Sequence, residues 1–389
     1  MRSRSEASAA EGIALIMCCW CTVLAAGLVA PILPAMRNDF ATIPHIDLLV
    51  GGVAAAPALM VALLALPIGA AADSLSLRGM LLAGLAIYGT AGVMPAVLGS
   101  LGGIIVSRIV AGIGEGATMI ASTALIARRF EGERQRRWLA LQVLAANVLG
   151  IAVVLLSGRL GLVSWRLPFV GYAFGLLMMV PVALLVRTDK ASPAIPTRTE
   201  TASAAWAWRA MAGLCLLYLL VTIAMFSIIL QLPFLLAERG AADSFAIGLG
   251  LAAGALGLAA GAAASARLAA RGWRARALVG LVVIAAGFGA IGVSRDLAVT
   301  ELAAAIAGMG AGFALPALLA AFVASVPRDS VGRALGVWTV AGFAGQFATP
   351  PTVLALADLN GRGTAYALLG VACLIGALAI ALTPKGMQR

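Results

Sequence analysis

Histidine and lysine are nearly missing from this chain. One histidine, His45, and two lysines, Lys190 and Lys385, occur in 389 residues. A hydrolytic or metal-dependent enzyme needs clustered ligands or a nucleophile beside a base, and an ATP-driven machine needs a lysine after a glycine-rich phosphate loop. The sequence has neither pattern. We therefore expect a protein that is not an enzyme and that holds no metal and no cofactor.

Charged residues are also scarce. They make up 11% of the chain, whereas apolar residues make up 62%. A soluble protein needs roughly 25% charged residues for its surface, so most of this surface must face lipid. The five cysteines all lie in apolar runs and are interpreted as small apolar residues without disulfides: Cys18, Cys19, Cys21, Cys215 and Cys373.

Long apolar runs dominate what remains. A membrane helix needs about 20 apolar residues, and the sequence contains twelve runs of that kind. They cover 12–36, 46–70, 79–98, 101–127, 138–158, 166–187, 210–235, 246–266, 277–294, 298–326, 334–357 and 364–383. We therefore expect an all-α polytopic membrane protein, with an N-terminal six-helix bundle (1–187), a linker (188–209) and a C-terminal six-helix bundle (210–389).

The two halves repeat each other. Gly112-Ile-Gly-Glu-Gly116 and Gly308-Met-Gly-Ala-Gly312 lie 196 residues apart, each inside a long apolar run. Glu133 and Arg137 match Asp329 and Arg333 at the same offset. The first copy carries a mid-helix acid where the second carries alanine. A duplicated bundle with one buried acid is the layout expected of a secondary transporter.

Positive charge is distributed unevenly between the loops. If the amino terminus is cytoplasmic, cytoplasmic segments hold 20 of the 27 Lys and Arg residues. That asymmetry places both termini and the linker in the cytoplasm of a cell whose inner (plasma) membrane the chain crosses many times. It also accounts for the net charge of +11, because the basic loops would face anionic lipid headgroups. We expect a monomer with no nucleic-acid partner.

Glu115 is the one acid near the middle of a predicted span. A charge there costs about 2.5–3.5 kcal/mol on the lenient insertion scale, so this acid should face water or a partner, or be protonated. Arg108 lies seven residues earlier on the same face, about 10 Å away along a straight helix. Water or a substrate anion could bridge the two in a central cavity; the alternative is a buried pair that only locks helix packing.

Few other polar side chains lie within the spans. Asn147 and Gln142 fall in the fifth span, Tyr218 and Gln231 in the seventh and Gln346 in the eleventh. Asn147, Tyr218, Gln231 and Gln346 are candidate substrate contacts. The alternative for each is a hydrogen bond between helices, worth about 1–2 kcal/mol at most.

The chain resembles the major facilitator superfamily over its whole length. The fourth span, Arg108-Ile-Val-Ala-Gly112, is similar to the family's Arg-x-x-x-Gly helix, and Gly69-x-x-x-Asp73 with Arg78 matches part of its loop signature after the second helix. Ser74 and Ser76 replace the usual arginine and glycine there. The resemblance implies two rocking bundles, a cavity lined by spans 1, 4, 7 and 10, and a cytoplasmic gate at Gly69, Asp73 and Arg78.

The subfamily and substrate stay open at this point. The Gly-Ile-Gly-Glu-Gly run resembles organic-anion–cation symporters and spinster-like members, whereas the fifth helix lacks the Gly-Pro of drug–proton antiporters. We expect alternating-access transport of a small organic solute, coupled to protons through Glu115 with Arg108 nearby; sodium is the alternative coupling ion. The alternatives are an efflux antiporter for drugs or metabolites and a non-transporting receptor with the same fold.

Overall fold

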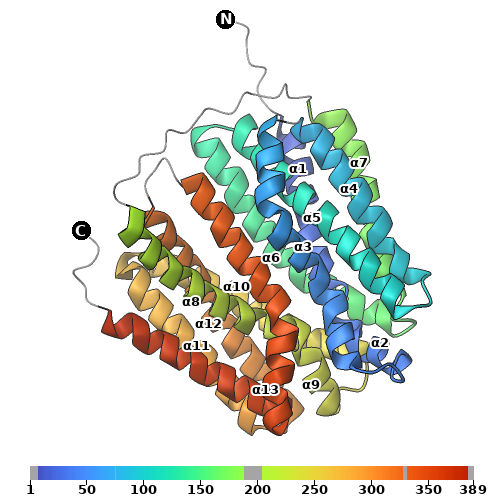
Figure 1. The fold of residues 1–389 in the computed structure, drawn as a ribbon, viewed down its shortest axis with the longest axis vertical. Coiled ribbons are helices and arrows are strands. Elements are labelled where there is room, and N and C mark those ends of the chain that lie inside the picture. Colours follow the sequence, from blue (N-terminus) through green and yellow to red (C-terminus); the bar gives the residue numbers. More distant parts are fainter. Residues whose placement is uncertain (1–7, 75, 188–203, 327–330, 384–389) are drawn as a thin grey trace, which may run out of the picture.

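The computed structural model describes residues 8–74, 76–187, 204–326 and 331–383, and that part of the chain is helical without strands. The α-helices are α1 (Ala9–Gly27), α2 (Leu33–Asp39), α3 (Ile46–Ser74), α4 (Leu77–Val93), α5 (Leu101–Arg129), α6 (Gly132–Gly161), α7 (Phe174–Leu185), α8 (Ala204–Leu230), α9 (Leu232–Glu238), α10 (Ser244–Arg267), α11 (Gly272–Val293), α12 (Leu297–Ala324) and α13 (Val331–Leu382). Four short 3-10 helices join them: η1 (Ala30–Ile32), η2 (Met94–Ala96), η3 (Leu167–Ala173) and η4 (Ala269–Arg271). Figure 1 shows them as one long bundle.

Twelve crossings are present, as expected. Eleven helical segments of the described residues are long and apolar enough to cross a membrane. The last of them contains non-helical backbone at Asn360 and at Gly361, whose φ is +82°. A positive φ suits glycine because it has no Cβ. The chain turns at this point, so α13 provides the eleventh and twelfth spans.

Two boundaries differ from those predicted. The first span breaks at η1 and continues as α2, because Pro31 and Pro34 lack the amide that a continuous helix needs. Helix α8 begins at Ala204, inside the predicted linker 188–209, because no proline or glycine interrupts the chain there; the part of it that is long and apolar enough to cross a membrane is Met211–Leu230, close to the predicted start at 210. The rest of that linker, 188–203, lies outside the described residues.

Each repeated glycine run packs two helices together within its own half of the chain, and the two contacts correspond. A Cβ built on Gly112 would lie 2.6 Å from the backbone of Pro57 in α3, and one on Gly308 would lie 2.2 Å from the Gly254 carbonyl oxygen in α10. Contacts under 3 Å cannot accommodate a side chain without backbone movement. Each glycine run therefore allows two neighbouring helices to approach closely, and the duplication read from the sequence corresponds to a structural repeat.

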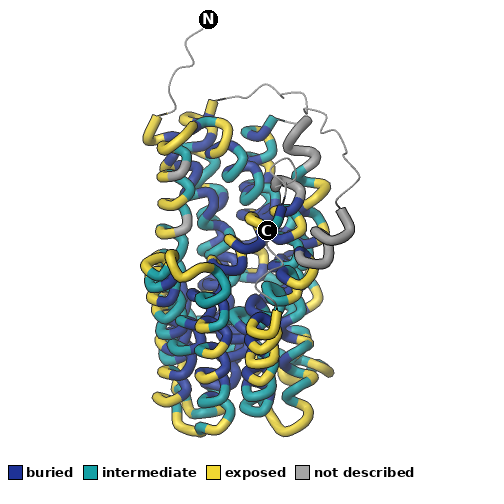
Figure 2. The backbone as a smooth tube through the Cα atoms, turned by 90° about the vertical axis from the view of Figure 1, so that its left-hand side faces the viewer, coloured by how far each residue is buried: buried dark blue, intermediate teal, exposed yellow. Residues whose placement is uncertain are grey.

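The outer surface of the bundle is apolar. Leu184 is 78% exposed and Leu177 66% exposed, in common with many other large apolar side chains. Buried residues concentrate towards the interior of the bundle (Figure 2). An apolar surface of this extent is suited to lipid. The first residues of α1 and the last residues of α13 lie away from α2 and α9, which are close together at the other end of the bundle (Figure 1).

The N-terminal half (α1–α7) and the C-terminal half (α8–α13) touch most closely on the side of α2 and α9. A Cβ on Gly158 in α6 would lie 2.7 Å from the Ser244 carbonyl oxygen at the start of α10. A Cβ on Gly51 in α3 would lie 2.9 Å from Pro350 in α13. These tight contacts close the bundle between the halves at that end.

Candidate functional site

A cavity of about 480 Å³ lies between the two halves and is called the central cavity below. Helices α1, α5 and α6 line it from the N-terminal half, and α8, α10, α12 and α13 line it from the other. Spans 1, 4, 7 and 10, which the resemblance implied, all contribute, and spans 5, 8 and 11 join them. Most lining residues are apolar; the polar ones are Thr22, Glu115, Asn147, Tyr218, Thr222, Trp338, Thr339 and Gln346.

Glu115 is the only residue with a formal charge among the described residues that line the central cavity. It lies midway along α5, which runs unbroken for 29 residues from an N-cap at Ser100. Its side chain is only 4% exposed. Within the described part of the chain, no side chain or amide forms a hydrogen bond or ion pair with its carboxylate. A buried acid without a protein partner is compensated by a proton, by a bound cation or by water in the cavity.

Arg108 lies outside the wall of the central cavity. It is fully buried, and it donates from Nε to the Val53 carbonyl oxygen (3.2 Å) and from Nη2 to the Ala25 carbonyl oxygen (3.1 Å). Its guanidinium also lies 4.5 Å from the centre of the Tyr172 ring. These contacts hold α5 against α1, α3 and η3. The described residues include no direct Arg108–Glu115 pair, as the helical spacing predicted.

Three of the four predicted substrate contacts line the central cavity: Asn147, Tyr218 and Gln346. Tyr218 stacks on Trp338 with ring centres 3.8 Å apart and planes 9° apart. The sequence did not single out Trp338, because it lies near the predicted start of its span and was indistinguishable from an interfacial tryptophan. Gln231 is instead fully buried at the N-cap of α9, away from the cavity wall.

The predicted gate lies at the end that carries the termini. Gly69 is in α3 with open space where a Cβ would be. Arg78 donates from Nη2 to the Ala183 carbonyl oxygen (2.6 Å) and so ties α4 to α7. The side chain of Asp73 lies outside the described residues, so its pairing with a cation stays a prediction.

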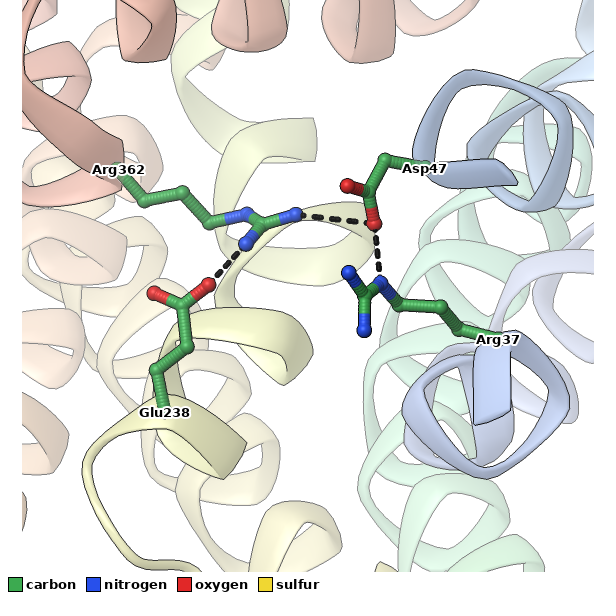
Figure 3. Close-up of polar contacts among 4 residues, drawn as sticks. All are labelled: Arg37, Asp47, Glu238 and Arg362. Atoms are coloured by element: carbon green, nitrogen blue, oxygen red, sulfur yellow. Dashed lines mark hydrogen bonds and ion pairs between the residues drawn. The ribbon is translucent and has the colours of Figure 1, made fainter. Parts of the chain in front are cut away.

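A network of four charged side chains joins the halves at the opposite end (Figure 3). Asp47, at the start of α3, pairs with Arg37 of α2 in its own half and with Arg362 of the other half, the latter at 3.4 Å. Arg362 also pairs with Glu238. This network could not be predicted from the sequence, because each of its residues is typical of an ordinary charge in a loop or at a helix end.

Comparisons with known proteins agree with this arrangement. The sequence profile of the Major Facilitator Superfamily matches residues 15–298 and 214–386. No curated protein sequence matches the chain.

Solved structures with the same fold include the human organic anion transporter MFSD10 (TETRAN), which is 18% identical with a TM-score of 0.72 and covers 95% of this chain and 99% of its own. A bacterial homologue of the human lysosomal transporter Spinster is 17% identical with a TM-score of 0.72, covering 95% of both chains. A POT family transporter solved with 5-aminolevulinic acid is 14% identical with a TM-score of 0.78, covering 96% of this chain and 95% of its own. At these identities the likeness concerns the fold. The profile covers nearly the whole chain, and the chain belongs to the Major Facilitator Superfamily: it is a multi-pass membrane transporter and not an enzyme.

Proposed function

We propose that this transporter is secondary active, that it moves a small organic solute by alternating access, and that Glu115 carries the coupling proton. The observation that carries the proposal is the position of Glu115. It is the one formally charged group among the described residues of a cavity that both halves line. Its charge therefore affects both halves at once.

The coupling of proton movement to solute movement follows from the free-energy cost of burying the Glu115 carboxylate. A carboxylate in a dry, apolar site is unfavourable by several kcal/mol, whereas the neutral acid is tolerated. Water or solute in the cavity changes that balance, so the proton is taken up or released according to which end is open. A ligand shifts a conformational equilibrium by its difference in affinity for the two states, and the proton is such a ligand here.

The other residues take supporting roles in this proposal. Asn147, Tyr218 and Gln346 contact the solute from both halves of the central cavity. Arg108 positions α5 through the carbonyl oxygens of Ala25 and Val53, and its charge acts on Glu115 at a distance, without a direct contact. Gln231 belongs to the contact surface between the halves near Gly51 and Pro350.

Alternating access needs a gate on each side of the cavity. The network of Arg37, Asp47, Arg362 and Glu238 is the gate at one end, because Asp47 and Arg362 belong to different halves. Gly69, Asp73 and Arg78 form the gate at the other end. Separation of Arg362 from Asp47 would open the central cavity on the side of α2 and α9.

The orientation in the membrane follows from the loop charges. We place both termini and the 188–209 linker in the cytoplasm and the charged network outside, in the cell (inner) membrane, with the basic loops against anionic headgroups. The transporter is proposed to act as a monomer.

The experiment is solute uptake by purified protein in liposomes. Radiolabelled organic solutes are screened with an imposed pH gradient, a sodium gradient or neither. We expect accumulation with the pH gradient alone, and we expect Glu115→Gln to lose it while keeping solute counterflow. Thr339→Val, a change of similar size on the opposite wall of the same cavity without loss of charge, is the matched control and should keep both.

Three outcomes would contradict the proposal. Accumulation by Glu115→Gln equal to that of the unaltered protein would make the acid structural. Accumulation that follows only the sodium gradient would assign coupling to sodium. Binding without flux of any solute would indicate a receptor.

A further inference from the structure

The charges around the central cavity restrict what it can bind. Apart from Glu115, the described residues that line it carry no formal charge. The guanidinium of Arg108 is fully buried outside the cavity lining, where Nε and Nη2 donate to the Val53 and Ala25 carbonyl oxygens beside the Tyr172 ring and Nη1 has no hydrogen-bond partner among the described residues. An anion in the cavity would lie beside an acid with no cation in the cavity wall to compensate it. Burial of an unpaired charge is strongly unfavourable, so anionic solutes are excluded while Glu115 is ionised.

The carboxylate itself needs a positive partner. Glu115 is 4% exposed and forms no hydrogen bond or ion pair within the described part of the chain. The titratable groups that act on it electrostatically are Arg108 on its own helix, Cys21 of α1, Tyr88 of α4 and Tyr172 of η3. Arg108 does not reach it, and the other three are ordinarily uncharged near neutral pH. A positive partner in direct contact with the carboxylate therefore comes from outside the protein, as a proton or as a cationic solute that displaces water from the cavity.

The opposite wall favours a flat, apolar body. Tyr218 and Trp338, from the C-terminal half, stack at 3.8 Å and both line the central cavity. Phe226 and Phe343 line it nearby. Aromatic faces attract cations and pack against other aromatic rings in offset or edge arrangements. The volume of about 480 Å³ is within the range of pockets that enclose small organic ligands.

We infer that the central cavity binds an organic monocation with an aromatic body, and that this cation and the coupling proton compete for Glu115. The inference rests on the proposed function and extends it. Binding replaces one positive charge by another: the protonated acid releases its proton to water, and the carboxylate then pairs with the cation. The proton and the solute cannot occupy the acid together, so they cross the membrane in opposite directions.

The balance of charge between the proton and the cation has a testable consequence. One proton moves in for each monocation that moves out, so the net charge transferred is zero. Exchange of this kind is driven by a pH gradient and is insensitive to membrane potential. Uptake of the same cation together with a proton would move two charges and would respond strongly to potential, at about 2.3 kcal/mol per charge for 100 mV.

The experiment uses three probes of similar shape and different charge. They are N-methyl-4-phenylpyridinium (cation), 4-phenylpyridine (neutral near pH 7.5) and biphenyl-4-carboxylate (anion). Binding to detergent-solubilised protein is measured by calorimetry in buffers of different ionisation enthalpy, which reports the protons released. We expect only the cation to bind well, with release of about one proton per cation at the pH where Glu115 is protonated, and with weaker binding as the pH falls.

Transport by the protein in liposomes completes the test. Cation accumulation should follow a pH gradient that is acidic on the opposite side, and a potassium diffusion potential alone should drive none. Glu115→Gln, which resembles the protonated acid, should bind the cation more weakly, through the aromatic wall alone, release no proton and lose exchange with protons, whereas Glu115→Asp should keep proton release and exchange in part. Trp338→Leu, which leaves the charge in place, should weaken cation binding but preserve proton release.

Two results would overturn the inference, and they are distinguishable from failure of the proposed function. Anion accumulation driven by the pH gradient and abolished in Glu115→Gln would keep proton coupling at Glu115 but reject the cation. Cation uptake driven by membrane potential with a proton moving in the same direction would reject competition for the acid. Transport of any probe that is indifferent to both pH gradient and Glu115→Gln would refute the proposed function itself.

Discussion

Removal of the Asp47 carboxylate should open the cavity at the end where α2 and α9 lie. Asp47 provides the one described ion pair that crosses between the halves, to Arg362 at 3.4 Å, and it also holds Arg37 within its own half. The Asp47→Asn change keeps the size of the side chain and removes its charge. Arg362 keeps its pair with Glu238, whereas Arg37 loses its carboxylate partner and, being 40% exposed, is left to water.

The expected size of the effect on opening follows from how far the two paired side chains are exposed to solvent. The Arg362 and Asp47 side chains are 12% and 33% exposed, so their attraction is partly screened by water. Exposed pairs contribute about 0.2–1 kcal/mol, and we take the upper end because Arg362 is largely enclosed. About 1 kcal/mol changes a conformational ratio roughly fivefold. The fraction of molecules open at this end should rise by that factor.

Distances between spin labels measure the opening. Labels at Thr42 and Ala242, which are exposed and belong to opposite halves, report separation of this end in a protein without its native cysteines. Arg37→Gln is the matched control, because it breaks only the pair within the N-terminal half. An unchanged distance distribution in Asp47→Asn, or the same change in Arg37→Gln, would refute the role of the Asp47–Arg362 pair.

Three other results are expected. Gly308→Ala should lower the free energy of unfolding by about 1–3 kcal/mol, because its Cβ would lie 2.2 Å from the Gly254 carbonyl oxygen. Gly289→Ala is the control and should not lower it, since a Cβ at Gly289 would meet open space. Equal thermal stability of the two variants would contradict the packing argument. Arg108→Met should lower the thermal stability and the yield of folded protein, since two buried carbonyl oxygens lose their donor. The protein that does fold should keep pH-driven transport. A stable variant that has lost only coupling would place Arg108 in the proton path. Cysteines at 187 and 242 should react with impermeant reagents from opposite faces of the membrane, and labelling from the same face would contradict the assigned topology.

Much of the fold could be predicted from the sequence because the features that determine it lie within single short segments of the chain. A run of about 20 apolar residues is a helix in lipid whatever surrounds it. Pro31 and Pro34 account for the break in the first span by an equally local effect. Glu115 was found because a single acid in mid-span has few tolerable environments. The repeated glycines, at a constant offset, showed the duplication before any contact was known.

The rest of the site depends on contacts between distant parts of the chain. Arg108 is on the same helix as Glu115, and only the carbonyl oxygens of Ala25 and Val53 show that its long side chain is directed into helix packing. Trp338 reaches the cavity through its stack on Tyr218. The Asp47–Arg362 pair joins residues far apart in sequence, and nothing in either neighbourhood indicates the other.

The state of the Glu115 carboxyl group is the most direct test of the account. Infrared difference spectra, recorded when N-methyl-4-phenylpyridinium is added to the protein in lipid, resolve the carbonyl stretch of a protonated carboxylic acid from the bands of a carboxylate. We predict that binding removes a protonated-acid band and produces a carboxylate band, and that Glu115→Gln shows neither change. Bound cation with no loss of a protonated-acid band, or the same loss in Glu115→Gln, would contradict the assignment of the coupling proton to Glu115.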